Sequence, residues 1–286
     1  MSTVIRHNDT ISRNLIKTVI YVVCIFLSVL SILPFWIMFM NATRSTFEIQ
    51  QHAVSLLPSK YFANNWAILL GKSFNPLVGF MNSILVSSGA TLCAVYFSSL
   101  TAYALVAYTW KARDAFFTFI MCVLMIPAQV AGIGFYQFMY RIHWTNSLWP
   151  LILPAIAAPA MVFFMRQYLL ASLSLEIVDA ARIDGSGEFA TFNRIILPIM
   201  KPAIATQAIF SFVGSWNNLF TPLILLTDKS HYTMPIMVSL LRGDIYKTEY
   251  GSVYLGLALT SLPLFVIYFL LSRYIIAGVA LGGVKE

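Results

Sequence analysis

Charge is what this sequence has least of. Only 10% of the 286 residues are Asp, Glu, Lys or Arg, whereas soluble globular domains carry about 25%. The few charges fall in short blocks between long apolar runs, and 59% of the chain is hydrophobic. Because a soluble domain needs charge spread over its surface, the pattern predicts a polytopic membrane protein.

Cysteine and metal-ligand motifs are also scarce. Cys24, Cys93 and Cys122 fall inside apolar runs without CxxC spacing, so we interpret them as small packing residues. The four histidines lack HExxH spacing, and no GxSxG occurs. The sequence therefore indicates no disulfide, no metal site and no catalytic residues.

A phosphate-binding loop is missing as well. The only similar segment is Gly71-Lys72-Ser73, but the glycine that should precede it falls at Trp66. We expect that this chain is not an enzyme and does not hydrolyse ATP by itself.

Six windows without acidic or basic residues are long enough for the roughly 20 residues of a membrane-spanning helix. They are residues 18–40, 75–110, 115–140, 144–165, 202–227 and 250–272. Helices are expected because the bilayer offers no water to unpaired backbone groups. The prediction is an all-α fold of about six spans, with both termini on one side. The first window is too long for a signal peptide and lacks a convincing cleavage site.

Prolines interrupt most of these windows. Each removes a backbone donor and disfavours a straight helix. The prolines concerned are Pro34, Pro127, Pro154, Pro159, Pro222 and Pro263. Kinked helices around a transport pathway and ordinary packing of membrane helices both account for them.

Basic residues favour one orientation. More of them lie in the N-terminal tail (1–14), at 111–113, in 166–201 and at the C-terminus than in the opposite loops. The positive-inside rule then predicts cytoplasmic termini and an external segment at 42–74. We expect a cytoplasmic tail at 1–14 and a single membrane domain at 15–286, which includes this external segment. The net charge of +7 is interpreted as topological rather than as a nucleic-acid surface.

The segment 167–201 is too polar to face lipid and too long for a simple turn. Ser174 is a plausible N-cap, and residues 184–187, Asp-Gly-Ser-Gly, are typical of a helix stop. Phe189, Phe192 and Ile196 fall on one face of a second helix, which we expect to end at Leu197-Pro198. Exposed apolar residues in such a segment indicate a docking site. A hairpin lying on the bilayer is the alternative.

A family resemblance follows from this segment. Asp179-Ala180-Ala181, Gly185 and Ile195-x-Leu197-Pro198 match the EAA motif of ABC importer permeases, E-A-A-x3-G-x9-I-x-L-P, at every spacing. The one departure is Asp179, where the family usually has Glu. From about Phe80 onward the chain is similar to carbohydrate permeases of the maltose type. Further matching residues are Asn82-Ser83, 102–105, 125–127, Trp216-Asn217 and 282–285.

The resemblance implies a type I ABC importer permease (MetI-like) fold in the bacterial inner membrane, and a pathway for a sugar or oligosaccharide shared with a homologous second permease. Two separate ATPase subunits, which bind the ATP and Mg, would dock on a cytoplasmic coupling loop at 167–201. An external solute-binding protein would deliver the substrate. A permease for a non-sugar solute and a secondary carrier subunit are the alternatives. Against the carrier, the window centres lack Asp, Glu and Arg that could hold coupling ions.

Polar residues within the windows are candidates for lining the pathway. Amides and aromatic faces suit sugars, although hydrogen bonding between helices explains the same residues. The candidates are Asn82, Gln137, Gln207, Trp216, Asn217 and Asn218.

Overall fold

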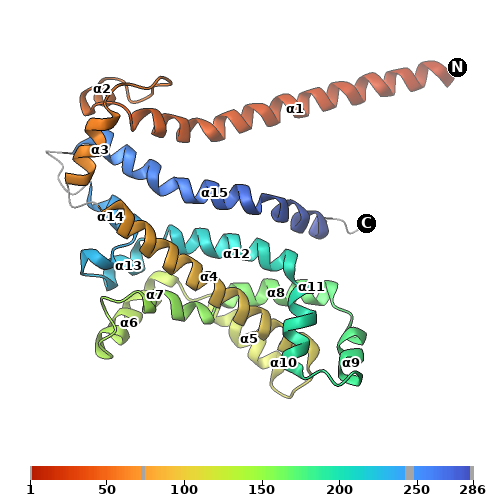
Figure 1. Cartoon of the computed structure of the whole chain (residues 1–286). Helices are drawn as coiled ribbons and strands as arrows, with labels where there is room; N and C mark the ends of the chain where they lie inside the picture. The colour runs from red at the N-terminus through yellow and green to blue at the C-terminus, as the bar shows by residue number, and fades with distance from the viewer. Residues whose placement is uncertain (1, 72–74, 242–247, 284–286) are drawn as a thin grey trace. The chain divides into compact units, whose positions relative to one another are not determined.

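The computed structural model describes residues 2–71, 75–241 and 248–283, and all regular structure within these ranges is helical (Figure 1). In chain order the elements are α1 (Ser2–Asn41), α2 (Thr46–Gln51), α3 (Phe62–Gly71), α4 (Pro76–Ala107), α5 (Arg113–Leu124), α6 (Ala128–Arg141), α7 (Trp149–Ile152), η1 (Leu153–Ile156), α8 (Pro159–Ser172), α9 (Leu175–Ile183), α10 (Glu188–Thr191), η2 (Phe192–Ile196), α11 (Leu197–Ile199), α12 (Lys201–Trp216), α13 (Phe220–Leu225), η3 (Lys229–His231), α14 (Met234–Leu240) and α15 (Tyr250–Gly283). The predicted tail at 2–14 continues the helix of the first span.

Within the described ranges, four helical stretches are long and apolar enough to cross a bilayer. They are Leu15–Asn41, Pro76–Ala107, Trp149–Ser172 and Tyr250–Phe269. The number rises to six if each of two bent pairs is one crossing. In the first pair, Arg113–Leu124 and Gln129–Arg141 meet at 99°, and in the second, Glu188–Ile199 and Lys201–Trp216 meet at 80°. The predicted all-α polytopic fold is confirmed.

Prolines mark several of the helix breaks. Pro127 is the N-cap residue of α6, directly after the break in the third predicted window. Pro154 lies in the short 3-10 helix η1, and Pro159 begins α8. These positions suit proline because the first turn of a helix has no intrahelical partner for its N–H groups. Pro34 and Pro263 are instead accommodated inside α1 and α15.

The fifth predicted window, 202–227, is not one helix. Helix α12 ends at Trp216 and α13 begins only at Phe220. Between them the side-chain oxygen of Asn218 accepts the Thr221 N–H at 3.3 Å. An Asn that binds nearby backbone competes with the helical ladder, which explains the interruption.

The chain divides into two compact units. Unit 1 contains residues 1–74 and 241–259, and unit 2 contains residues 75–240 and 260–286.

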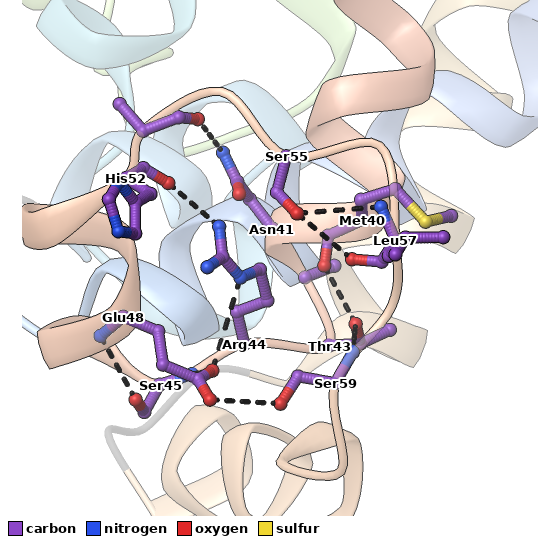
Figure 2. A network of polar contacts seen from close by, with 12 residues as sticks. Met40, Asn41, Thr43, Arg44, Ser45, Glu48, His52, Ser55, Leu57 and Ser59 are labelled. Carbon is purple, nitrogen blue, oxygen red and sulfur yellow. Dashed lines mark hydrogen bonds and ion pairs between the residues drawn. The ribbon is translucent and has the colours of Figure 1, made fainter.

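In unit 1, the segment between α1 and α3 is folded tightly by polar contacts (Figure 2). Ser45 and Glu48 form a reciprocal capping box at the start of α2. Arg44 donates to the carbonyl of His52 at 2.7 Å, and Asn41 donates to the carbonyl of Ala53 at 2.9 Å. These bonds satisfy backbone groups that lie outside the helix α2 in this segment.

The same segment is tied to the start of α15. The Asn65 amide donates to the carbonyls of Ala42 and Arg44, both at 2.9 Å, and Ser252 donates to the Asn65 carbonyl at 3.1 Å. A Cβ on Gly251 would collide with the Arg44 carbonyl and the Asn65 amide, so this close approach requires glycine. Unit 1 therefore holds the end of α1 and the beginning of α15 together.

In unit 2, α4 is the central helix and packs against α8 and α12. Small residues on α4 allow this approach: Ala102 and Ser98 are fully buried, and Ala94 is nearly so. The core around them includes Met165 and Leu169 of α8 and extends to the segment that follows α9. The predicted coupling segment is thus packed onto the central helix of its own unit.

Candidate functional site

The candidate site is a helical hairpin of residues 174–199 between the spans α8 and α12. Its first arm, α9, follows Ser174, which occupies the predicted N-cap position but makes no side-chain capping bond. At the other end, the Gly185 N–H binds the Arg182 carbonyl at 3.0 Å and the Ser186 N–H binds the Ala181 carbonyl at 2.9 Å. This pair of bonds is a Schellman motif, which places a left-handed residue directly after the helix.

Gly185 is that left-handed residue, with φ of +78°. Nothing lies within 4 Å of a Cβ built on it, so its backbone conformation and not a lack of space calls for glycine. The predicted glycine turn is confirmed.

The second arm is one helical segment, Glu188–Ile199, that contains a π-helical turn at Phe192–Ile196. The Leu197 N–H reaches back to the Phe192 carbonyl. Pro198 follows in α11, where its missing N–H leaves no donor to satisfy. This helix ends at Ile199, directly after the predicted stop at Leu197-Pro198.

Burial differs along this arm. Phe192 and Ile196 are fully buried, whereas Phe189 is 67% exposed. The prediction that the three share one face is therefore wrong. In a regular helix Phe189 and Ile196 would nearly coincide, but the π turn rotates Ile196 away from Phe189 while keeping it beside Phe192.

Aromatic residues of α4 hold the second arm. The Phe192 ring stacks on Tyr103 at 5.8 Å and meets Tyr96 edge-on at 5.7 Å. The Tyr96 hydroxyl lies 3.2 Å from the side-chain oxygen of Asn193. Ring contacts of this kind stabilise beyond the area they bury, so the second arm is fixed to α4.

The first arm is much less covered. Val178 and Ala181 are buried, but Ile183 is 86% exposed. Leu175 and Ile177 are also exposed. Exposed apolar side chains gathered on one short helix are typical of a surface that another protein covers.

A charged cluster lies where the two arms meet. The Arg182 guanidinium donates to Glu188 at 2.8 Å and to Asp179 at 3.1 Å. The Tyr108 hydroxyl donates to Glu188 as well, and Tyr103 lies 3.4 Å from the same carboxylate. The Glu188 bond raises the pKa of Arg182 above its ordinary value. Partial burial raises the pKa of Tyr108, and its bond to Glu188 raises it further.

The structure places the motif residues on both arms. Asp179, Ala180 and Ala181 lie in α9, and only Ala181 is buried. Ile195 falls within the π turn, and Leu197 and Pro198 follow it in α11. The motif therefore runs along α9, through the Gly185 turn and into the second arm.

Sequence reasoning did not find the functional grouping of Arg182, Glu188 and Tyr108. The spacing of Asp179 and Arg182 by three residues was a signal for their ion pair. No local pattern connects Tyr108 with Glu188, because 80 positions separate them.

The predicted pathway residues differ in their hydrogen bonds within the chain and in their exposure to solvent. Asn82 donates to the carbonyls of Ser230 and Tyr232 at 2.8 and 3.0 Å, fixing the loop before α14. Trp216 is 1% exposed, and its indole N–H donates to the Thr260 carbonyl at 3.1 Å. In this state both residues hold the fold.

The remaining candidates are exposed or half-buried. Gln137 on α6 is exposed, and Gln207 on α12 is half-buried. Asn217 is exposed at the break after α12, and Asn218 is half-buried beside it. Their role in a pathway stays a prediction.

Two further predicted features lie partly outside the described residues. Of the phosphate-loop lookalike, Gly71 ends α3, while Lys72 and Ser73 are outside. Of the C-terminal matching stretch, Val284 and Lys285 are outside.

Within the described residues, helices long enough to span a membrane flank a polar hairpin, an arrangement that suits a membrane permease. The family described as "binding-protein-dependent transport system inner membrane component" matches residues 94–280. Because this match covers more than half of the chain, the protein belongs to that family.

Similar proteins agree with the assignment. The chain is 34% identical to the arabinooligosaccharides transport system permease protein AraQ of Halalkalibacterium halodurans, over 91% of this chain and 93% of the relative. It is 32% identical to the lactose transport system permease protein LacG of Rhizobium radiobacter, over 96% and 99%. It is 30% identical to the trehalose/maltose transport system permease protein MalG of Thermococcus litoralis, over 71% and 74%.

Among solved structures, a bacterial ABC transporter involved in the import of the acidic polysaccharide alginate matches with a TM-score of 0.77. The match covers 92% of this chain and 98% of that chain at 20% identity. It supports the type I importer permease fold.

Proposed function

We propose that this protein is the permease subunit of an ATP-driven importer for a sugar or oligosaccharide. It forms the translocation pathway with a homologous second permease and receives substrate from an external solute-binding protein. Two partner ATPase subunits bind ATP and Mg, and this chain supplies no ATPase site. Relatives named for transport of arabinooligosaccharides, lactose and trehalose/maltose support the substrate class.

The observation that carries the proposal is the form of the hairpin. Its motif residues lie along an arm that ends in a left-handed glycine at φ of +78°. That arm keeps Ile183 86% exposed. A membrane protein that leaves such side chains uncovered on a polar hairpin is suited to insertion into a partner.

The hairpin is also placed to pass motion to the spans. It connects directly to α8 at Ser172 and to α12 at Lys201, with a bend of 80° before α12. A partner that moves the hairpin therefore displaces the ends of two spans at once. Nucleotide-driven closing of the ATPases would favour one of two packed states, as rigid-body switching requires.

The break between α12 and α13 supports a pathway at Asn217. Non-helical backbone at membrane depth is tolerated where it is buried in protein or lines a water-filled cavity. Asn217 is exposed there and offers amide groups suited to sugar hydroxyls. Gln137, Gln207 and Asn218 are further candidates, and Asn82 and Trp216 would contribute only in another state of the cycle.

The proposed orientation has both termini and the hairpin in the bacterial cytoplasm and segment 42–74 outside. The distribution of Lys and Arg supports it. The family assignment, which names a binding-protein-dependent system, favours this importer over a secondary carrier.

A non-sugar substrate is the second candidate. The chain is 27% identical over 90% of its length to the sn-glycerol-3-phosphate permease protein UgpE of Pectobacterium atrosepticum. Uptake of labelled arabinotriose, lactose, maltose, trehalose and glycerol 3-phosphate by cells with and without this chain separates the two. Uptake of only the phosphate ester would favour the second candidate.

The central test is Gly185→Val. A β-branched residue at positive φ is strained by about 1–3 kcal/mol, which displaces α9 from its partner. We expect uptake and substrate-stimulated ATP hydrolysis by the complete transporter to be lost at an unchanged membrane level of the chain. The matched control is Gly185→Asn, because Asn tolerates the left-handed region and should retain most activity. Normal transport by Gly185→Val would overturn the coupling role of the hairpin.

A further inference from the structure

We infer that Arg182 is a positioning residue that fastens α9 to the end of α4 through Glu188 and Tyr108, so that the hairpin and this span move as one body. The inference rests on the proposed function and deepens it. It names the contact by which force on α9 reaches the central helix of unit 2. We call Asp179, Arg182, Glu188 and Tyr108 the Arg182 bridge.

The need for such a contact follows from the weak attachment of α9. Only Val178 and Ala181 of α9 are buried. Its apolar residues Leu175, Ile177 and Ile183 are exposed and contribute little to anchoring. The backbone turns at its two ends leave the helix free to tilt, since turns resist rotation much less than packed side chains do.

Arg182 faces three elements at once. Its guanidinium binds Asp179 on its own helix at 3.1 Å and Glu188 at the start of α10 at 2.8 Å. It also lies 5.4 Å from the centre of the Tyr108 ring, directly after α4. A planar guanidinium presents several donors in a fixed geometry, so these contacts define the angle of α9 and not only its distance.

Glu188 completes the link to α4. Its carboxylate accepts the Tyr108 hydroxyl and lies 3.4 Å from the Tyr103 hydroxyl, while Arg182 binds its other oxygen. Tyr103 and Tyr108 also meet edge-on at 5.5 Å. Charge-assisted hydrogen bonds are stronger than neutral ones, which favours one arrangement of the three elements.

The solvent exposure of the Arg182 bridge indicates how much it adds to the stability of the fold. The side chains of Arg182 and Glu188 are 36% and 48% exposed. Ion pairs with this much exposure to solvent add little to the global stability of a protein. A bridge of this kind contributes to the orientation of α9 far more than to folding. Its removal should therefore uncouple the hairpin from α4 while leaving the protein folded.

The experiment compares Arg182→Gln with Arg194→Gln in the complete transporter, isolated from its native membranes through a tag on this chain. Arg194 lies exposed on the same hairpin, and no ion pair or side-chain hydrogen bond joins it to another residue in the described ranges. The two variants lose the same charge. We measure thermal stability, retention of the ATPase subunits, hydrolysis of MgATP, and uptake of arabinotriose, lactose, maltose and trehalose.

We expect Arg182→Gln to lower uptake and stimulated hydrolysis about tenfold, a loss typical of coupling between sites. Thermal stability and ATPase retention should stay unchanged, and Arg194→Gln should behave as wild type. Equal losses in both variants would show that charge on the hairpin matters and would overturn the bridge. Unchanged transport in Arg182→Gln would overturn it as well.

Replacing the Arg182 bridge by a covalent link provides a second test of whether the hairpin and α4 move together. In a chain whose three native cysteines are substituted, Tyr108→Cys and Arg182→Cys are combined and joined with a short bifunctional thiol reagent, which ties α9 directly to the end of α4. We expect the unlinked double variant to be impaired and the linked one to regain transport. A link that blocks transport would mean that α9 and α4 separate during the cycle, contrary to the inference. If Gly185→Val fails to impair transport, the coupling role proposed for the hairpin is wrong, whereas failure of the bridge tests alone leaves that role standing.

Discussion

The two arms of the hairpin have a similar share of apolar residues but differ in how deeply those residues are buried. The second arm, Glu188–Ile199, buries Phe192 and Ile196 fully against its own unit. The first arm, α9, leaves Ile183 exposed. The difference indicates separate roles for the two arms. One arm is anchored within the chain, and the other is suited to present its apolar side chains to a partner.

The polar contacts follow the same division. Asn193 of the second arm meets Tyr96 of α4, while α9 relies on Arg182 at its last turn. Under the proposed function, the anchored arm would transmit displacement to α4 and α12, and the exposed arm would receive it. Three substitutions test this contrast, beginning with the largest expected effect.

Phe192→Ala should destabilise the protein most. Phe192 is fully buried between Tyr96 and Tyr103, and truncating a buried Phe costs about 3–5 kcal/mol. We expect a lower thermal transition of the purified protein and a lower membrane level. The matched control is Phe189→Ala in the same arm, where a 67% exposed ring should change stability by less than about 0.5 kcal/mol. Equal destabilisation by both would remove the distinction between the anchored and exposed positions.

Ile183→Ser should affect assembly rather than folding. This side chain is 86% exposed, so its loss removes no internal packing. If it docks on the ATPase, its removal should weaken binding by about 1–2 kcal/mol, the cost of truncating an important interface residue. The measurement is the amount of ATPase that co-purifies with the chain. Ile142→Ser, at an exposed isoleucine after α6, is the control. Full ATPase retention in Ile183→Ser would contradict the assignment of α9 as the docking arm.

Thr191→Val should have the smallest effect. The Thr191 hydroxyl is buried and lies 2.9 Å from the Ser186 hydroxyl and 3.2 Å from the Gly187 carbonyl, so it closes the turn between the arms. Losing these bonds should cost about 1 kcal/mol. Hydrogen exchange of the turn amides should become faster, with little change in the global transition. Thr191→Ser keeps the hydroxyl and should restore protection. Slow exchange in Thr191→Val would show that the turn does not depend on this hydroxyl.

Much of the fold was predictable because a membrane span is determined by local composition. Windows without charge predicted the four long helices, and Pro127 indicated the break before α6. The positive φ of Gly185 was also predictable, since a glycine after a helical stretch favours a left-handed turn. The interruption at Asn217 and Asn218 was missed because the window was defined by the absence of charge, and an uncharged side chain that competes for backbone bonds does not end such a window.

The sequence by itself determined the helical class, the hairpin and its motif, because hydrophobicity and turn chemistry act over a few residues. Only the tertiary structure decided that Phe189 faces outward, since a π turn changes the register of the buried face. Only the tertiary structure decided that Tyr108 meets Glu188, and that Trp216 donates to Thr260 inside the protein. Such pairings depend on how helices pack over long separations, and the local sequence carries no direct record of them.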